Sequence, residues 1–368
     1  MAASDTSPKL MTYFRRFFSH VRKRLPIYFV LMLIVFGVFF VFRDAIYDNF
    51  IRRHDETVIY YDENGMAVTD YGWVQGVYVG PQENPLVIAQ AAEHYYEQML
   101  EGNSSAEGYL LFLLNWIVEN RINQTIDAGE GPVEVCHWIY NFSIYDLPAG
   151  WYSAMADAEM LHTLALAYEH YNDSNYLSIC YEIITSFETN KELGGSRLII
   201  EGNESWYPEV IVPHAIDPNY PERRILNGFL FALEDLYYTY QILNESRVST
   251  LFQEGVETAA ESLHLYDAPE NWTYYQLDPL KLASESYHHI HIQLTQSLYE
   301  KTNITEFKTY HDLWSTYTKY PESPFWALTE RRVKEIQYGL IFMLAAASVI
   351  LLLDFLQMRL RLRFSGKN

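Results

Sequence analysis

The sequence predicts a mainly α-helical protein: an incomplete α/α toroid of antiparallel helical hairpins with β-hairpin insertions, flanked by two transmembrane helices. Three observations predict this class. Helical periodicity begins at residue 84 and continues, in segments of helix length, to residue 317. One segment, 151–170, is apolar on nearly every face, which is typical of a buried helix on the inner wall of a ring. Two long apolar runs lie near the chain ends.

The expected helices number eight and pair with their neighbours through short connections. They span 84–100, 106–121, 151–170, 174–190, 222–243, 247–263, 284–301 and 304–317. Eight helices are fewer than a closed ring of hairpins requires, so the ring should be incomplete or irregular. If 151–170 lies on the inner wall, Ala158, Leu161 and Ala165 should be buried.

Short β segments are expected before and between the helices. Residues 57–61 and 76–79 are predicted as strands, and Asn64-Gly65 between them is a strong hairpin signal. Two insertions are predicted as hairpins, each of two strands: 197–200 with 209–212, and 263–266 with 272–277. Hairpins between toroid helices can project functional side chains over one mouth of the ring.

The two apolar runs predict transmembrane helices at 26–42 and 336–356. Basic residues concentrate outside them, in the tails, so the charge bias places both tails in the cytoplasm and 43–335 outside the cell membrane. The expected plan is a basic cytoplasmic tail (1–25), a transmembrane helix (26–42), a small β-rich segment (43–83), the toroid (84–320), a second transmembrane helix (336–356) and a second basic tail (357–368).

Eight Asn-x-Ser/Thr sequons lie between the two apolar runs and none lies in the tails, which supports an extracytoplasmic central domain. They begin at Asn103, Asn123, Asn141, Asn172, Asn203, Asn244, Asn271 and Asn303. The net charge of −21 argues against nucleic acid as a partner. Cys136 and Cys180 can form a disulfide in such a compartment or remain buried thiols, and the sequence leaves both open.

The first candidate site is the start of 151–170, where Trp151 and Tyr152 precede Asp157 and Glu159. A rim of aromatic rings and acids at a pocket mouth suits a sugar, which stacks on one and hydrogen-bonds to the other. Acids in a first helical turn are also favoured by the helix dipole alone. We therefore expect Trp151, Tyr152 and Asp157 as substrate-binding residues, with a structural role as the alternative.

Three further clusters could carry chemistry, each in or beside a β insertion. They are Trp206-Tyr207-Pro208-Glu209, Tyr274-Tyr275 with Asp278, and the run Ser286 to Ile292, which holds Tyr287, His288, His289 and His291. His288 and His291 lie three residues apart on one helical face, so a metal pair is conceivable. No third ligand follows at a recognisable spacing, and we expect neither a metal nor a cofactor.

Two motifs resemble the C-terminal domain of the D-glucuronyl C5-epimerase family: Ala149-Gly-Trp-Tyr-Ser-Ala-Met-Ala156 with its following helix, and Leu226-Asn-Gly-Phe-Leu-Phe-Ala-Leu233. The resemblance extends over about residues 84–318. It implies an α/α toroid with β elements and an enzyme that removes the C5 proton of a hexuronic acid and returns it from the opposite face. In that family tyrosines, a glutamate and an arginine are assigned to the reaction.

The resemblance implies catalytic roles for Tyr287, Tyr275 and Glu209, which match the family motifs. Three positions depart from them. Val210 stands where a catalytic tyrosine is expected, Asp278 where the arginine is expected, and Pro208 where a first glutamate is expected. If Tyr287 acts as a base it needs a nearby cation, and His288 is one of the nearest in sequence. Trp206, Tyr207 and His288 are expected to bind substrate, and the three catalytic residues should converge at one mouth.

Three functions follow from these observations. The first is a membrane-anchored epimerase whose partners are a glycan substrate and the lipid bilayer. The second is a glycoside hydrolase or lyase on the same toroid, which would use Glu209 with Asp157 or Glu159 as a carboxylate pair. The third is a catalytically inactive glycan-binding envelope protein, for which Val210 and Asp278 explain the missing chemistry. The oligomeric state stays open, a homodimer included.

Overall fold

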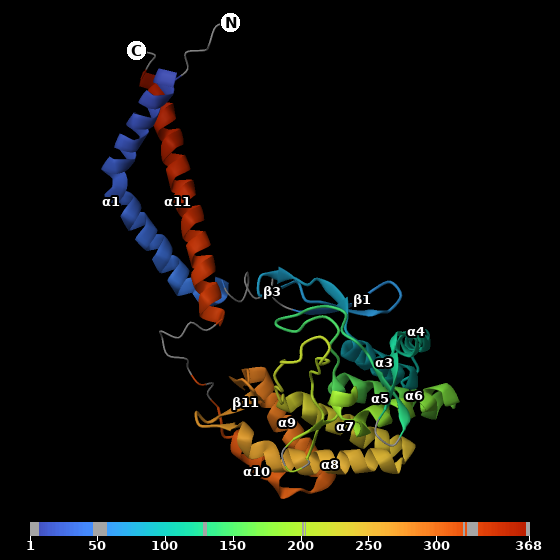
Figure 1. Cartoon of the computed structure of the whole chain (residues 1–368). Coiled ribbons are helices and arrows are strands. Elements are labelled where there is room, and N and C mark those ends of the chain that lie inside the picture. The colour runs from blue at the N-terminus through green and yellow to red at the C-terminus, as the bar shows by residue number, and fades with distance from the viewer. Residues whose placement is uncertain are drawn as a thin grey trace. The chain divides into compact units, whose positions relative to one another are not determined.

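The computed structural model describes residues 7–46, 57–127, 131–200, 202, 204–318, 321 and 330–365. The chain divides into two compact units, Met1–Glu56 with Ser323–Asn368, and Thr57–Glu322. The first unit consists of two long helices and the second of helical hairpins with short β elements (Figure 1). Of the expected β-rich segment 43–83, residues 47–56 lie outside the described part.

The first unit pairs α1 (Ser7–Ile46) with α11 (Glu330–Ser365). Within them, Phe18–Phe42 and Ile336–Gln357 are long and apolar enough to cross a membrane. Both helices extend beyond the predicted apolar runs into the basic segments beside them. Asp354, the one acid of the second run, is buried and accepts hydrogen bonds from Arg24 at 2.5 Å and from Tyr28.

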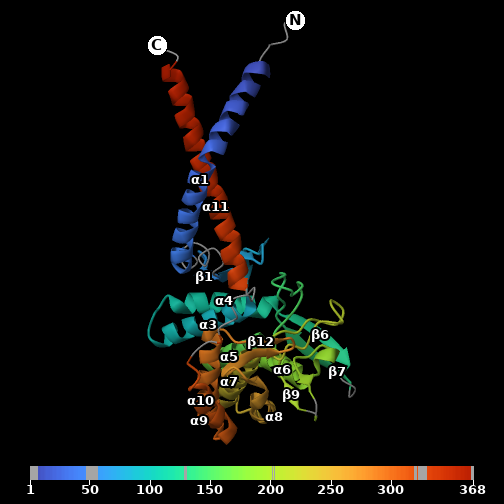
Figure 2. The same ribbon diagram turned by 90° about the vertical axis from the view of Figure 1, so that its left-hand side faces the viewer.

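The second unit contains, among its described residues, eight α-helices in four antiparallel hairpins. The pairs are α3 (Pro85–Leu100) with α4 (Ala106–Asn120), α5 (Ala154–Tyr171) with α6 (Ser174–Glu188), α7 (Leu226–Leu243) with α8 (Ser246–Ser262), and α9 (Glu285–Thr302) with α10 (Thr305–Trp314). The first helices of successive pairs pack on one another in the order α3, α5, α7, α9. In Figure 2, α3 and α4 lie above α5 and α7. This is the predicted incomplete toroid.

Helix α5 is the most buried element, as its apolar composition predicts. Ala158, Leu161 and Ala165 are fully buried, which confirms their expected place on the inner wall. The helix starts where the Ser153 hydroxyl accepts a hydrogen bond from the amide of Ala156 at 3.2 Å, and it packs between α3 and α7. The predicted bounds of all eight helices agree with the structure to within a few residues.

The first predicted hairpin has a different partner strand. The Asn64-Gly65 turn connects β1 (Val58–Tyr61) to β2 (Ala67–Asp70), and β2 also pairs with β5 (Pro81–Glu83). The expected strand 76–79 contributes only β4 (Val77–Tyr78), which pairs with β3 (Trp73–Val74). A tight turn joins the strands on its two sides directly. In β2 two apolar residues precede two polar ones, Thr69 and Asp70, so the alternation that indicates a strand is missing. The sequence also gave no signal for the hairpin of β6 (Ile122–Asp127) and β7 (Pro132–His137).

The two later insertions are also corrected. Strand β8 (Leu198–Ile199) pairs with β9 (Ser205–Trp206) rather than with 209–212, because Pro208 has no amide hydrogen with which to extend that ladder. Residues Leu263–Tyr266 form a 3₁₀ turn at the end of α8. The second insertion instead consists of β10 (Asp267–Ala268), β11 (Trp272–Leu277) and β12 (Leu280–Leu282).

A buried polar cluster anchors the start of α5. The Asp157 carboxylate lies 2.8 Å from Nδ1 of His137 on β7 and accepts a hydrogen bond from the Ser196 hydroxyl at 2.9 Å. The other ring nitrogen of His137 lies 2.8 Å from the carbonyl oxygen of Gly194. All three side chains are buried, so the cluster fixes the β6–β7 hairpin and the 194–196 loop to the inner helix. Cys136, next to His137, and Cys180 on α6 are both buried free thiols.

Replacing Asp157 by Ala should destabilise the protein by about 3 kcal/mol or more, because His137 and Ser196 lose a buried charged partner. Urea unfolding of the full chain in detergent, followed by tryptophan fluorescence, measures the loss. Asp173→Ala is the matched control: it removes an exposed helix cap and should cost about 1 kcal/mol. Equal effects of the two substitutions would contradict the anchoring role of Asp157.

Candidate functional site

Glu209 lies in the segment that follows β9 and is held against the start of α5 by backbone hydrogen bonds. The amide of Ala154 donates to the Pro208 carbonyl at 3.0 Å, and Tyr152 and Ile211 exchange two backbone bonds of 3.0 and 2.8 Å. These bonds on both sides of Glu209 fix where its side chain begins. The segment thus forms a bridge to the inner helix rather than the expected hairpin strand.

The Glu209 carboxylate packs on the first turn of α7. Its Oε2 accepts a hydrogen bond from the Asn227 side-chain amide at 3.1 Å. A Cβ atom on Gly228 would lie 2.3 Å from the same oxygen, so this close approach requires glycine. The start of a helix carries partial positive charge, which favours a carboxylate there. The Asn-Gly pair of the Leu226–Leu233 motif therefore positions the Glu209 carboxylate.

Two tyrosines extend from this carboxylate toward solvent. The Tyr275 hydroxyl donates to Oε1 of Glu209 at 3.2 Å, and the rings of Tyr275 and Tyr287 are 4.8 Å apart. Tyr275 lies on β11 where the register with β12 shifts, and Tyr287 lies in the first turn of α9. Tyr287 is 38% exposed, so the three residues run from a sheltered carboxyl group to an accessible phenol. The structure therefore brings Glu209, Tyr275 and Tyr287 together, as expected, while their catalytic roles stay predictions.

The environment changes the acidity of all three groups. Burial raises the pKa of Glu209 to about 7, and hydrogen bonds from Tyr275, Asn227 and the Gly228 backbone partly oppose this rise. Burial and then the charge of Glu209 raise the pKa of Tyr275 above the usual tyrosine value. Burial, Glu209 and Tyr145 raise the pKa of Tyr287 in the same direction. Near neutral pH Glu209 can therefore gain or lose a proton while both tyrosines remain protonated.

One cation lies beside this site, on a strand that was not predicted. The Lys281 ammonium, on β12, lies 5.4 Å from the centre of the Tyr275 ring. Arg223 forms an ion pair with Asp146 and lies 5.1 Å from the ring centre of Tyr220. The predicted strands end at residue 277, so they do not include Lys281. The motif containing Asn227 and Gly228 was recognised, but not its contact with Glu209.

Trp151, Tyr152 and Asp157 do not form the expected rim. Trp151 is 8% exposed and stacks on Tyr140 with ring centres 3.7 Å apart. The Tyr152 hydroxyl donates to the Gly195 carbonyl at 2.8 Å, and Asp157 is fully buried against His137. The start of α5 supports the Glu209 segment through its backbone while its side chains face inward, which is the structural alternative.

The remaining expected binding residues also lie in the core. Trp206 is fully buried against Phe229, at 3.9 Å between ring centres. Tyr207 is fully buried and donates to the Leu251 carbonyl at 2.8 Å. His288 stacks on Trp272 at 3.8 Å, on the face of α9 turned away from solvent. Trp206 and Tyr207 are buried together although neighbours in a strand point to opposite faces, and β9 ends at Trp206. His288 lies on the buried face of α9, whereas Tyr287 beside it is exposed.

The other histidine and acidic candidates are engaged elsewhere. His288 and His291 both direct Nδ1 to the Thr273 hydroxyl, at 3.0 and 3.1 Å, and burial lowers the pKa of His291 to about 3. Burial and the neighbouring Glu93 raise the pKa of Glu159 to about 8. Among the described residues no group of three or more His, Cys, Asp or Glu side chains could hold a metal ion.

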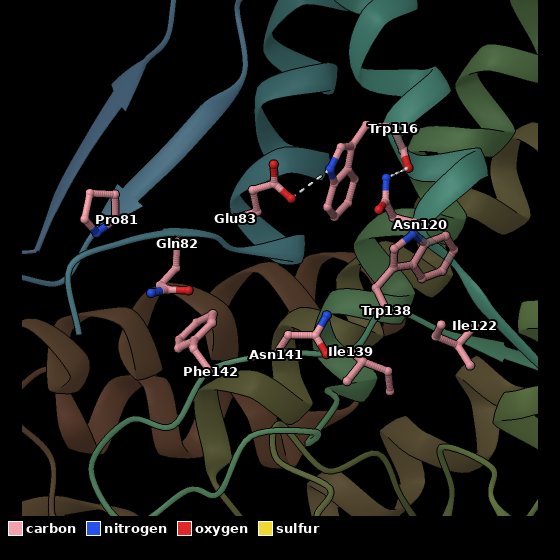
Figure 3. Close-up of a pocket in the computed structure, with 10 residues that line it drawn as sticks. All are labelled: Pro81, Gln82, Glu83, Trp116, Asn120, Ile122, Trp138, Ile139, Asn141 and Phe142. Carbon is pink, nitrogen blue, oxygen red and sulfur yellow. Dashed lines mark hydrogen bonds between the residues drawn. The ribbon is translucent and has the colours of Figure 1, made fainter.

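A separate hollow of about 310 Å³ lies between the first β elements and the end of α4 (Figure 3). Trp116 is fixed there by a hydrogen bond from its indole nitrogen to Glu83 at 3.1 Å, and Asn120 donates to the Trp116 carbonyl at 3.0 Å. The lining residues are Pro81, Gln82, Glu83, Trp116, Asn120, Ile122, Trp138, Ile139, Asn141 and Phe142. This hollow includes none of Glu209, Tyr275 and Tyr287, so it is distinct from the carboxyl–tyrosine site.

Comparison with known proteins supplies a family. The family described as D-glucuronyl C5-epimerase C-terminus matches residues 130–316, which include Glu209, Tyr275 and Tyr287. The uncharacterized protein MJ1128 of Methanocaldococcus jannaschii is 29% identical over 312 residues, 79% of this chain and 96% of that protein. The D-glucuronyl C5-epimerase of Caenorhabditis elegans is 31% identical over 198 residues, 49% of this chain but only 30% of its own length. Among solved structures, a GH76 alpha-mannanase of Bacteroides thetaiotaomicron is 13% identical with a TM-score of 0.44, covering 88% of this chain and 86% of that one.

Replacing Glu209 by Gln should change how stability depends on pH. A carboxyl group whose pKa is raised on folding stabilises the folded state below about pH 4.5, and this contribution is lost as the pH rises through about 7. The loss is of the order of 3 kcal/mol for a shift of this size. Urea unfolding from about pH 4 to about pH 8 should show a steeper decline in the wild type than in the Gln variant, which keeps only the contribution of other raised carboxyl groups such as Glu159. Parallel curves would mean that the pKa of Glu209 is not raised.

Proposed function

Because this chain belongs to the D-glucuronyl C5-epimerase C-terminus family, we propose that it is a carbohydrate epimerase that inverts C5 of a hexuronic acid within a glycan. In this reaction a base removes the C5 proton, the electron pair is held by the adjacent carboxyl group, and a proton returns from the opposite face. The observation that carries the proposal is the connected series of Glu209, Tyr275 and Tyr287.

Tyr287 is the accessible end of this series, and we place it against C5 of the sugar. When its oxygen takes the C5 proton, its own proton passes to Tyr275, and the Tyr275 proton passes to the Glu209 carboxylate. One proton thus moves from carbon to Glu209, and neither tyrosine is left as a phenolate. A carboxyl group with a pKa of about 7 can accept and return this proton at neutral pH. The relay accounts for a tyrosine base despite the raised pKa values of both phenols.

The opposite face of the sugar requires a second proton carrier, because Val210 cannot act as one. Tyr145 is our candidate: it is 64% exposed, and its proximity to Tyr287 is reflected in its effect on the pKa of that residue. The developing charge on the sugar carboxylate requires a cation. Lys281, beside Tyr275, is the candidate that replaces the arginine expected at Asp278.

The direct test is solvent deuterium incorporation at C5 of a glucuronate-containing oligosaccharide. The full chain should incorporate deuterium, and Tyr287→Phe should reduce the rate by about 100-fold or more, because the proton-transfer group is lost. Tyr181→Phe is the matched control: Tyr181 is 40% exposed on α6, and its replacement should leave the rate unchanged.

The same assay distinguishes the competing functions. New reducing ends without exchange would indicate a hydrolase, which would need a partner carboxylate other than Asp157, since Asp157 is held by His137 and Ser196. Binding of the oligosaccharide without exchange would indicate an inactive glycan-binding protein. Either outcome would overturn the epimerase proposal.

We also propose that α1 and α11 anchor the protein in the cell membrane, with both tails in the cytoplasm and 43–335 outside. The domain plan then consists of the tails (1–25 and 357–368), the two spans, the segment 43–83 and the toroid at 84–320. The hydrogen bonds that Asp354 accepts from Arg24 and Tyr28 support the membrane anchor, because polar side chains inside a membrane need hydrogen-bond partners within the protein.

This topology predicts the result of adding protease to right-side-out vesicles. The protease should digest the central part of the chain and leave both tails intact, because only the central part faces the medium. Tail-specific antibodies on a gel of the digest detect the outcome. If the central part were protected from the protease, the proposed orientation would be wrong.

A further inference from the structure

Three helices of the inner layer end in the same way. Asn172, Asn244 and Asn303 follow α5, α7 and α9 in left-handed backbone conformation, with φ of 53°, 49° and 57°. Each amide donates to the carbonyl of the tyrosine four residues earlier, at 2.8, 2.9 and 2.8 Å; these tyrosines are Tyr168, Tyr240 and Tyr299. Asparagine is the side chain that best tolerates this cap after glycine. A short structural repeat therefore marks successive hairpin turns.

Each of these asparagines also begins an Asn-x-Ser/Thr sequon. The third residue of the sequon is the first residue of the outer helix, namely Ser174, Ser246 or Thr305. The α3–α4 turn carries a fourth sequon at Asn103, whose side chain accepts a hydrogen bond from the amide of Ser105 at 3.1 Å. All four asparagines are exposed. Four of the eight sequons thus occupy the same place in four consecutive hairpins.

These turns lie at the end of the toroid away from Glu209. The starts of α5, α7 and α9 all lie near Glu209. Helix α5 bonds to Pro208, the residue before Glu209, and α7 contributes Asn227. Helix α9 contributes Tyr287, whose ring packs on Tyr275, the residue that donates to Glu209. Each of the three helices has 18 residues. At about 1.5 Å per residue their far ends lie roughly 27 Å from their starts. A group attached at a hairpin turn would leave the carboxyl–tyrosine site open to a glycan substrate.

We propose that Asn103, Asn172, Asn244 and Asn303 carry N-linked glycans, so that one end of the toroid is glycosylated and the opposite end binds substrate. The inference rests on the outward-facing topology proposed above and not on epimerase activity. Chemically, the side-chain amide nitrogen bonds to the anomeric carbon of a lipid-phosphate-linked oligosaccharide donor. The amide loses a proton, and the lipid phosphate leaves.

Helix capping alone offers a competing explanation of the repeat, since asparagine suits the left-handed cap and serine or threonine suits the start of a helix. Substitutions at one turn separate the two explanations. Ser174→Ala keeps the Asn172 cap but destroys the sequon, whereas Ser174→Thr keeps both. Asn172→Gly keeps the left-handed turn but removes the attachment nitrogen.

The full chain is purified from membranes of its own source cells, and its proteolytic peptides are analysed by mass spectrometry. We expect glycan masses on the peptides of all four asparagines, and loss of one glycan in Ser174→Ala and Asn172→Gly but not in Ser174→Thr. Unmodified peptides would overturn the inference. If the peptides are unmodified, vesicle proteolysis shows whether the proposed topology is wrong as well or only the glycosylation. Exchange at C5, measured separately, tests the proposed activity.

Discussion

The contact between the Glu209 carboxylate and the first turn of α7 is the constraint on which the candidate site depends. It needs glycine at position 228, because any Cβ there would lie within 2.3 Å of Oε2. It also needs the backbone bonds that join Pro208 and Ile211 to the start of α5. Since the Tyr275 hydroxyl donates to the same carboxylate, a shift of Glu209 would break the hydrogen bond that connects it to the two tyrosines.

Two opposing effects set the acidity of Glu209. Removing a carboxylate from water favours its neutral form, whereas hydrogen bonds from Tyr275, Asn227 and the backbone of Gly228 favour the charged form. Burial prevails, but only to a pKa of about 7. A drier site would leave the group permanently protonated, and a wetter one permanently ionised. The balance gives a group that exchanges protons at neutral pH, as the proposed C5 inversion requires.

The sequence predicted the helices and the grouping of Glu209, Tyr275 and Tyr287 for different reasons. Periodicity fixes the faces of long helices, so the burial of Ala158 and Ala165 followed directly. Glu209, Tyr275 and Tyr287 came together because family motifs carry spatial information that composition lacks. The predicted rim at Trp151 and Asp157 was wrong, because aromatic and acidic residues at the start of a helix can pack inward as readily as they can line a pocket. The predicted pairing of 197–200 with 209–212 was wrong because Pro208, which has no amide hydrogen, ends the β8–β9 ladder.

The departures at Val210 and Asp278 lie on the chain next to the catalytic cluster, yet a reaction depends on where groups lie in space. Lys281 reaches the Tyr275 ring from the strand that pairs with β11, only three residues beyond Asp278. Tyr145, in a loop far away in sequence, contributes to the raised pKa of Tyr287. In our proposal Lys281 and Tyr145 replace the missing cation and the missing phenol from neighbouring elements, without a change in the position of Glu209. The carboxylate is the most constrained part of the site, because its position depends on the amide of Asn227 and on the absence of a Cβ atom at Gly228.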